Sequence, residues 1–220
     1  LTITTFIVDT TAATLAEVTV VTTPTNDSTP DYTFSSSEAG TITYGGTCSS
    51  STTSATTDNN TITLVSLSDG TYSNCTITVT DNSSNSVTLN INSFVIDTTA
   101  PTVSSISPTD NQSGVSISDN ISVTFSEAMD NTTVTTNTDN TTCYGSFALS
   151  SDNFSSCVQM SSSPTSSNSD KTFTLDPYDN LSGASNYKIR VTTGVKDTAG
   201  NTLSSQYDNS TGFTTTSSST

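Results

Sequence analysis

The amino-acid sequence predicts an all-β protein built from two antiparallel β-sandwiches in tandem. Three observations support this prediction. Short segments alternate between apolar and polar residues, turn-forming residues separate these segments, and the stretch that begins at Leu1 recurs from Leu89, an offset of 88 residues. Alternation with a period of two is typical of strands that bury one face. Self-similarity at a fixed distance is typical of tandem modules.

The composition alone leaves open whether the chain folds. Leu, Ile, Val and Phe together make up 43 of 220 residues and the net charge is −16, which is close to the composition of disordered chains. Alternation decides the question in favour of folding. Apolar residues occupy every second position at 76–80 and 86–92, and again at 121–125 and 187–191. The Thr residues between them suit strands because they are β-branched.

The predicted strands follow one another without any helical stretch, as in a Greek-key sandwich. In the first module we predict strands near 15–22, 31–36, 41–44, 61–66, 72–80 and 86–96. In the second module we predict strands near 103–106, 120–126, 133–136, 144–149, 171–175, 186–193 and 210–215.

The repeated stretch sets the expected domain boundaries. Residues 1–14 read LTITTFIVDTTAAT, and residues 89–102 read LNINSFVIDTTAPT. The second copy fits the last strand of the first module. The first copy is therefore expected to be the last strand of a preceding module, or a strand donated to a neighbouring molecule, in a chain that is a segment of a longer protein. The expected parts are a terminal strand at 1–9, domains at 10–98 and 99–215, and a Ser/Thr-rich linker at 216–220.

Motifs in both modules resemble known bacterial repeats. GTYSNCTITVTD at 70–81, followed by FVIDTTAP at 94–101, resembles the bacterial Ig-like repeats of large surface adhesins. VTFSEAMD at 123–130, VKDTAGN at 195–201 and GFTT at 212–215 resemble the bacterial Ig-like domain first described in surface-layer proteins. The resemblance implies two tandem Ig-like Greek-key β-sandwich domains, an extracellular or bacterial cell-surface location, and neighbouring repeats of the same protein or fibre as partners.

The composition excludes several classes of function. Without His there is no Ser-His-Asp or Cys-His catalysis and no imidazole metal ligand. Four Lys and Arg residues give no footprint for nucleic acid. No apolar run approaches the roughly 20 residues of a membrane helix, so no membrane insertion is expected in this segment. With no Trp, and with Tyr and Phe mostly at inward strand positions, we predict that the chain is not an enzyme.

The four cysteines are predicted to form disulfides within the modules. Cys48 and Cys75 lie in the first module, and Cys143 and Cys157 lie in the second. An even number in each module of an acidic chain rich in Ser, Thr and Asn is typical of an oxidising, extracellular compartment. A zinc site is the alternative, but neither pair has CxxC spacing and the chain lacks His.

Carboxylates are predicted to gather where the chain enters each module. Strands alternate in direction, so the incoming linker shares one end of a sandwich with the loops after the second and sixth strands. These segments carry Asp9, Glu38 and Asp81 in the first module and Asp97, Glu127 and Asp197, with Asn201 close by, in the second; Asp69, from the exit loop of the first module, is expected near Asp97.

Two explanations fit these acidic groups. Gathered carboxylates repel one another unless a cation is present, and Ca²⁺ accepts six to eight oxygen ligands in flexible geometry. Calcium sites between modules are also what the resemblance to Ig-like adhesin repeats implies. Alternatively, each Asp or Glu bonds to backbone N–H groups of its own turn.

The leading functional prediction is a structural spacer or stalk segment of a bacterial extracellular fibre or adhesin, with junctions rigidified by calcium. One alternative is a self-assembling filament subunit joined by donation of the strand at 1–8. A second alternative is an adhesin module that binds a glycan or a protein. The long loops between Cys143 and Cys157 and at 161–170, the latter expected to be flexible, motivate that alternative.

Overall fold

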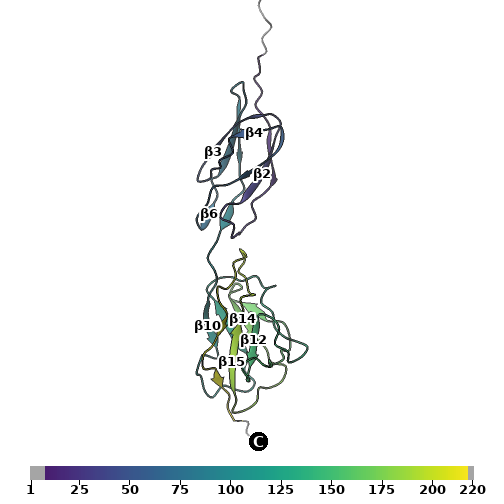
Figure 1. Cartoon of the computed structure of the whole chain (residues 1–220), viewed down its shortest axis with the longest axis vertical. Helices are drawn as coiled ribbons and strands as arrows, with labels where there is room; N and C mark the ends of the chain where they lie inside the picture. The colour runs from purple at the N-terminus through teal and green to yellow at the C-terminus, as the bar shows by residue number, and fades with distance from the viewer. Residues whose placement is uncertain (1–7, 218–220) are drawn as a thin grey trace, which may run out of the picture. The chain divides into compact units, whose positions relative to one another are not determined.

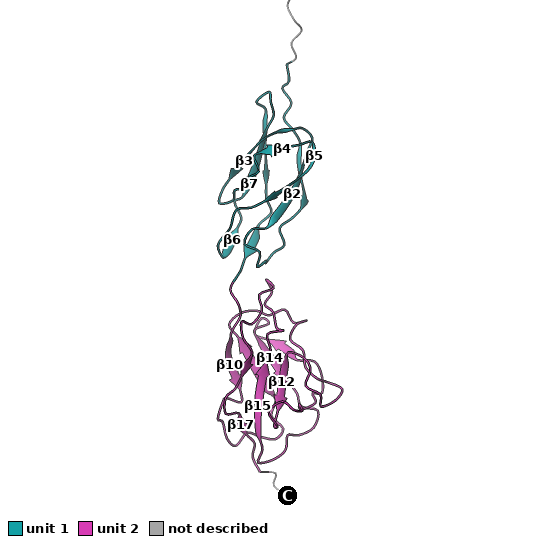
Figure 2. Cartoon of the chain, in the orientation of Figure 1, with its two compact units in different colours: residues 1–98 teal, residues 99–220 magenta. Residues whose placement is uncertain are grey.

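The computed structural model describes residues 8–217 and divides the chain into two compact units, Leu1–Thr98 and Thr99–Thr220 (Figure 2). Both units are built from antiparallel β-sheets (Figure 1). The predicted terminal strand at 1–8 lies outside the described residues except for Val8, and so does the predicted linker except for residues 216 and 217. No helix in the described part of the chain is long and apolar enough to cross a membrane.

Unit 1 is a sandwich of two main sheets. One sheet has the order β1-β2-β5, the other has the order β4-β3-β7-β8, and β6 pairs with β9. The chain crosses between the main sheets after β2 and returns after β4, which is typical of Greek-key sandwiches. The strands are β1 (Leu15–Thr19), β2 (Asp31–Ser36), β3 (Gly40–Gly45), β4 (Ser54–Ala55), β5 (Asp58–Thr63), β6 (Gly70–Tyr72), β7 (Thr76–Thr80), β8 (Ser86–Asn90) and β9 (Phe94–Ile96).

The core of unit 1 follows the alternation in its sequence. Strand β2 buries Tyr32 and Phe34 and strand β7 buries Ile77 and Val79, while the residues between them are partly exposed. Outward hydroxyls pair across strands, as in the 2.8 Å contact between the side chains of Thr78 and Thr88. A thin apolar core is therefore covered on its outer faces by Thr and Ser.

Unit 2 repeats this architecture with longer loops. One sheet has the order β10-β11-β14-β13, and the other contains β12-β15-β16 with β17 paired to β15. Phe125 of β11 and Phe173 of β14 meet edge to face, with ring centroids 6.0 Å apart, inside the core. The strands are β10 (Val103–Ser107), β11 (Ile121–Phe125), β12 (Phe147–Ser150), β13 (Thr165–Ser167), β14 (Thr172–Leu175), β15 (Asn186–Val191), β16 (Tyr207–Asp208) and β17 (Phe213–Thr214).

Two predictions about single segments of unit 2 were wrong. The predicted strand at 133–136 is irregular, because the Ser146 hydroxyl accepts the N–H of Thr135 and the N–H groups of Ser146 and Phe147 both bond to the carbonyl of Thr135. The segment at 161–170, predicted as a flexible loop, contains β13, which pairs with β14. Its Ser and Thr residues are exposed, so no apolar alternation marks the strand in the sequence.

The predicted disulfides are present. Cys48 is bonded to Cys75, with Cα atoms 5.2 Å apart, and Cys143 is bonded to Cys157, with Cα atoms 5.0 Å apart. Cys75 lies between β6 and β7, so the predicted strand at 72–80 is two strands. Because β3 pairs with β7, the first bridge joins neighbouring segments of one sheet rather than the two sheets of the sandwich.

Candidate metal sites

The segment that enters unit 1 is fastened to the loop between β2 and β3. The N–H of Thr14 donates to the hydroxyl of Ser37 at 2.9 Å, and the N–H of Ser37 donates to the carbonyl of Thr14 at 3.1 Å. Glu38 follows Ser37 directly, and its own N–H bonds to the Ser36 hydroxyl. This reciprocal pair holds the incoming chain beside the loop that carries Glu38.

Asp81 anchors the tight turn between β7 and β8. One of its carboxylate oxygens accepts the N–H groups of Ser83 at 2.7 Å and Asn85 at 2.9 Å. The other oxygen accepts the side-chain amide of Asn85 at 2.8 Å. Hydrogen bonds from Asn85, above all from its side chain, hold the pKa of the Asp81 carboxyl below its usual range, although desolvation acts in the opposite direction. Asp81 is therefore ionised at neutral pH.

Asn85 also connects this turn to Asp9. Its side-chain amide donates to the backbone carbonyl of Asp9 at 3.2 Å, while the Asp9 carboxylate accepts the N–H of Thr11 at 3.0 Å. Carboxylate oxygens of Asp9, Glu38 and Asp81 all lie within 4.8 Å of one another. Asp81 is buried, Glu38 is half-buried and Asp9 is exposed, so the group opens from the protein interior to solvent.

Unit 2 contains the same fastening around Glu127. The N–H of Thr102 donates to the hydroxyl of Ser126 at 3.0 Å, and the N–H of Ser126 donates to the carbonyl of Thr102 at 2.9 Å. Glu127 follows Ser126 as Glu38 follows Ser37. The incoming chain and the loop after the second strand of the sandwich are thus joined in the same way in both units.

The turn at Asp197 also matches the turn at Asp81. One oxygen of Asp197 accepts the N–H groups of Ala199, Gly200 and Asn201 at 2.7–2.9 Å, and the other accepts the side-chain amide of Asn201 at 2.8 Å. Gly200 has a φ of 99°, in the left-handed region that favours glycine. The equivalent residue in unit 1 is Ser84, with a φ of 71°. The two turns share most of these hydrogen bonds, and Asp197 accepts one more from the N–H of Gly200, although their sequences share only the Asp and the Asn.

Two acidic triads could hold a metal ion: Asp9, Glu38 and Asp81, and Asp97, Glu127 and Asp197. Asp69, which the sequence also singled out, belongs to neither triad, and its carboxylate accepts the N–H and the hydroxyl of Thr98. Asn201 takes part through the turn of Asp197.

Turn anchoring and cation binding are compatible at these carboxylates. The turn role that the sequence offered as an alternative is present at Asp81 and Asp197, whose oxygens accept several N–H groups. Each carboxylate oxygen has about two lone-pair sites, and the second oxygen of Asp81 and of Asp197 accepts only one hydrogen bond, so that oxygen can still contact a cation. Hard oxygen ligands of this kind suit Ca²⁺. Gathering three ionised carboxylates is unfavourable without such a counter-charge.

Comparison with known proteins agrees with this architecture. Residues 97–215, more than half of the chain, match the family described as "Bacterial Ig-like domain". The chain belongs to the bacterial Ig-like domain family. No curated protein sequence matches it. Bacterial Ig-like domains are typically non-catalytic surface domains, in keeping with the prediction that the chain is not an enzyme.

The bacterial Ig-like chain is also similar to parts of solved S-layer structures. The crystal structure of the S-layer protein rSbsC(31-844) is 24% identical over 54% of this chain and 14% of that chain, with a TM-score of 0.38. The crystal structure of the N-terminal part of the bacterial S-layer protein SbsC is 24% identical over 54% of this chain and 24% of that chain, with a TM-score of 0.37. The chain thus spans less than a quarter of the length of these proteins.

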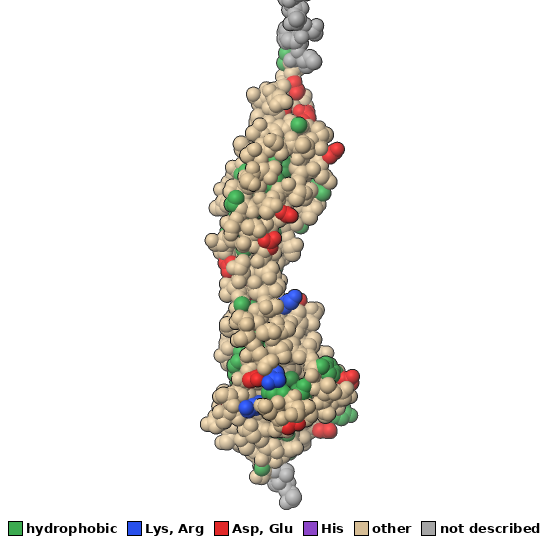
Figure 3. Space-filling model, viewed as in Figure 1, with side chains coloured by type: hydrophobic (Ala, Val, Ile, Leu, Met, Phe, Trp, Pro, Cys, Tyr) green, Lys and Arg blue, Asp and Glu red, His purple; other side chains and the backbone are tan. Residues whose placement is uncertain are grey.

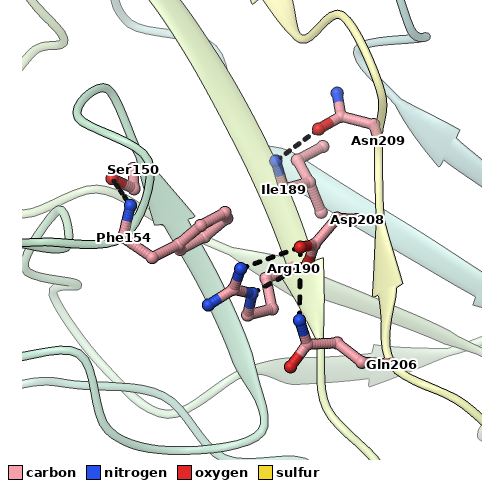
Figure 4. A network of polar contacts seen from close by, with 7 residues as sticks. All are labelled: Ser150, Phe154, Ile189, Arg190, Gln206, Asp208 and Asn209. Atoms are coloured by element: carbon pink, nitrogen blue, oxygen red, sulfur yellow. Dashed lines mark hydrogen bonds and ion pairs between the residues drawn. The ribbon is translucent and has the colours of Figure 1, made fainter.

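Unit 2, which contains most of the residues that match the bacterial Ig-like family, has one further polar network that the sequence did not predict. The guanidinium of Arg190 forms two 2.8 Å contacts with Asp208 and lies 3.7 Å from the ring centre of Phe154 (Figure 4). The hydrogen bond from Arg190 lowers the pKa of the Asp208 carboxyl. On the face drawn in Figure 3, blue Lys or Arg side chains of unit 2 lie beside red Asp or Glu and green hydrophobic side chains. The network joins β15 to β16 through Arg190 and Asp208, and to the loop after β12 through Phe154, whose N–H bonds to Ser150 of that strand.

Proposed function

We propose that the chain is a structural spacer segment of a bacterial cell-surface or extracellular protein, in which Ca²⁺ rigidifies the place where each Ig-like module is entered. A bound cation would join Asp9, on the incoming segment, to Glu38 and Asp81, on two loops of the sandwich. The cation would replace repulsion between carboxylates with attraction and would restrict the angle at which the chain enters unit 1.

One observation supports this proposal above the others. In both units a reciprocal pair of hydrogen bonds between a Thr and a Ser holds the incoming chain, and a Glu follows that Ser in the sequence. In both units an Asp also accepts the side-chain amide of an Asn four residues later and so closes a turn. Turn anchoring accounts for Asp81 and Asp197 but not for the Glu that lies beside the fastened incoming chain in both units. The same arrangement of residues at the start of each module is expected of a chain whose function is to connect modules.

A cell-surface location is supported by independent features. Each unit contains one disulfide, and disulfides persist in oxidising compartments. The family match is to a bacterial Ig-like domain, and members of this class occur at bacterial surfaces. A net charge of −16 favours solubility and mutual repulsion of chains rather than dense packing.

Calorimetry of the whole chain tests the calcium part of the proposal. Thermal unfolding is recorded with Ca²⁺, with Mg²⁺ and with EGTA. At a Ca²⁺ concentration 100 times the dissociation constant, binding should stabilise unit 1 by about 2.7 kcal/mol and raise its melting temperature by several degrees. Glu38→Gln should abolish this rise, whereas Asp27→Asn, an acid of unit 1 outside the triad, should retain it. Equal melting temperatures in Ca²⁺ and EGTA would contradict calcium binding.

Single-molecule pulling tests the spacer part separately. A chain that bears load should unfold one unit at a time when it is pulled from its two ends, and each disulfide should shorten the released length by the residues that it encloses. The force needed for unit 1 should fall when EGTA replaces Ca²⁺. Unfolding of both units at negligible force, with intact disulfides, would argue against a load-bearing spacer even if calcium binds.

A further inference from the structure

Unit 2 contains a hollow of about 230 Å³ on the side of the disulfide-bridged loop. The segments on either side of the Cys143–Cys157 bridge form one wall, and the loop between β14 and β15 forms the other. The hollow is smaller than the sites of drug-sized ligands, so it suits one or two small rings. Its lining comprises Thr141, Val158, Gln159, Asp179, Asn180 and Ser182, together with Tyr178, Leu181 and Tyr187.

An exposed aromatic ring stands at this hollow. The side chain of Tyr178 is 64% exposed, more than any other aromatic side chain in residues 8–217. A Tyr ring offers a large, rigid apolar face together with a polar tip. Such a face suits the C–H groups on one side of a sugar ring, because these groups are apolar while the hydroxyls around the ring remain free to form hydrogen bonds.

The rim of the hollow is polar but carries no cation. Asp179 and Asn180 are exposed, and neither side chain forms a hydrogen bond with the described part of the chain. Carboxylate and amide groups can bind two neighbouring hydroxyls at once, since they present two polar atoms in one plane. All four Lys and Arg residues of the chain lie outside the lining. This chemistry favours a neutral polyhydroxylated ligand over an anion.

The floor of the hollow is apolar apart from one buried hydroxyl. Leu181 and Tyr187 are each only 4% exposed, and the Tyr187 ring stacks on Phe213 with centroids 5.8 Å apart. The hydroxyl of Tyr187 accepts the N–H of Ser182 at 2.9 Å. The Tyr187 hydroxyl donates to no group in the described part of the chain, so its own proton remains available to a ligand.

The walls are held in place without a ligand. The N–H of Cys157 donates to the carbonyl of Thr141 at 2.8 Å beside the disulfide, and the N–H of Tyr178 donates to the carbonyl of Gln159 at 2.9 Å. The N–H of Leu181 donates to the carbonyl of Ile117 at 2.8 Å. A hollow formed in advance binds with a smaller entropic cost than one that must be ordered by its ligand.

We propose that this hollow binds one or two pyranose rings of a neutral glycan, with Tyr178 stacking on a ring face and Asp179 and Asn180 binding its hydroxyls. The site is independent of the proposed calcium sites, because it contains none of their residues. It adds glycan recognition to a chain whose other features indicate a spacer.

Saturation-transfer NMR on the whole chain tests the proposal with a panel of neutral sugars: glucose, galactose, mannose, N-acetylglucosamine, N-acetylgalactosamine and their β-linked disaccharides. We expect at least one to bind with a dissociation constant in the micromolar to millimolar range, and the strongest transfer on the C–H groups of one ring face. Tyr178→Ala should weaken binding at least tenfold, while Tyr178→Phe, which keeps the ring, should change it by less than threefold. Val65→Ala, at an exposed apolar residue of unit 1, is the matched control.

Three results would overturn the proposal. One is the absence of transfer to every neutral sugar at 10 mM while circular dichroism shows a folded chain. The second is binding that Tyr178→Ala leaves unchanged. The third is binding of uronic or sialic acids alone, lost in Lys188→Ala, which would assign recognition to the separate hollow that Lys188 lines with Asn186. Because Tyr178 is exposed, its substitutions should leave the melting temperature of unit 2 unchanged.

Discussion

Replacing Asp197 with Ala should strongly destabilise unit 2. Asp197 is only 2% exposed, and its carboxylate accepts three backbone N–H groups and one side-chain amide. A buried donor that loses a charged acceptor costs about 1–3 kcal/mol. The N–H of Ala199 belongs to a buried residue and incurs this cost in full, whereas Gly200 and Asn201 are half-buried and water compensates in part. The total is about 3–4 kcal/mol.

Differential scanning calorimetry in EGTA measures this loss without any contribution from calcium. For a domain of this size, 1 kcal/mol corresponds to roughly 3–4 °C, so the transition of unit 2 should fall by about 10–15 °C. Asp197→Asn keeps one oxygen acceptor but sets its amide against that of Asn201, and should cost about half as much. The transition of unit 1 is the internal control. A fall of less than about 3 °C in Asp197→Ala would refute the assignment of Asp197 as the anchor of this turn.

Three further predictions concern unit 2. Replacing both Cys143 and Cys157 with Ala opens a loop of 14 residues and should cost about 3 kcal/mol in urea unfolding; an unchanged midpoint would contradict this. Arg190→Lys loses the two-point contact with Asp208 and the contact with Phe154, and should cost about 1 kcal/mol, whereas Lys188→Arg should be neutral in the same assay. Hydrogen bonds from Ser156 lower the pKa of Asp152 to about 2 from its usual 3.8, so its stabilisation is complete above about pH 5 and is lost progressively as the pH falls through 2. Asp152→Asn should therefore lose less stability than the unmodified chain between pH 4 and pH 2.

The sequence predicted the fold because its strands bury alternate residues. Strands β2, β7, β11 and β15 each coincide with a run in which apolar and polar residues alternate. For most of their ends, the observed bound lies within two residues of the predicted one. The strands that the sequence did not reveal, such as β4 and β13, are two or three residues long or have no buried face. In those segments pairing depends on backbone hydrogen bonds alone, which leave no pattern in the sequence.

The sequence predicted where in the fold the acidic residues lie, but not which groups their carboxylates contact. Topology brought Asp9, Glu38 and Asp81 to one end of a sandwich, because chain direction alternates from strand to strand. The hydrogen bonds that set each carboxylate could not be predicted, since Asn85 bonds to both Asp81 and Asp9 from a turn that has Ser84 where the turn of unit 2 has Gly200. The hollow at Tyr178 depends on loops that meet only in three dimensions. The one signal that the sequence offered there was the cysteine pair beside it.

The spacing of the acids shows how unit 2 differs from unit 1. Asp9 and Glu38 are 29 residues apart and Asp97 and Glu127 are 30 apart, so the incoming segments have nearly the same length. By contrast, Glu38 and Asp81 are 43 residues apart, whereas Glu127 and Asp197 are 70 apart. The additional 27 residues fall in the interval that contains the second disulfide and the proposed glycan site. Because the turn of Asp197 is closed by hydrogen bonds within five residues, an insertion earlier in the chain leaves it intact. Connecting modules and binding a ligand can therefore vary independently in this fold.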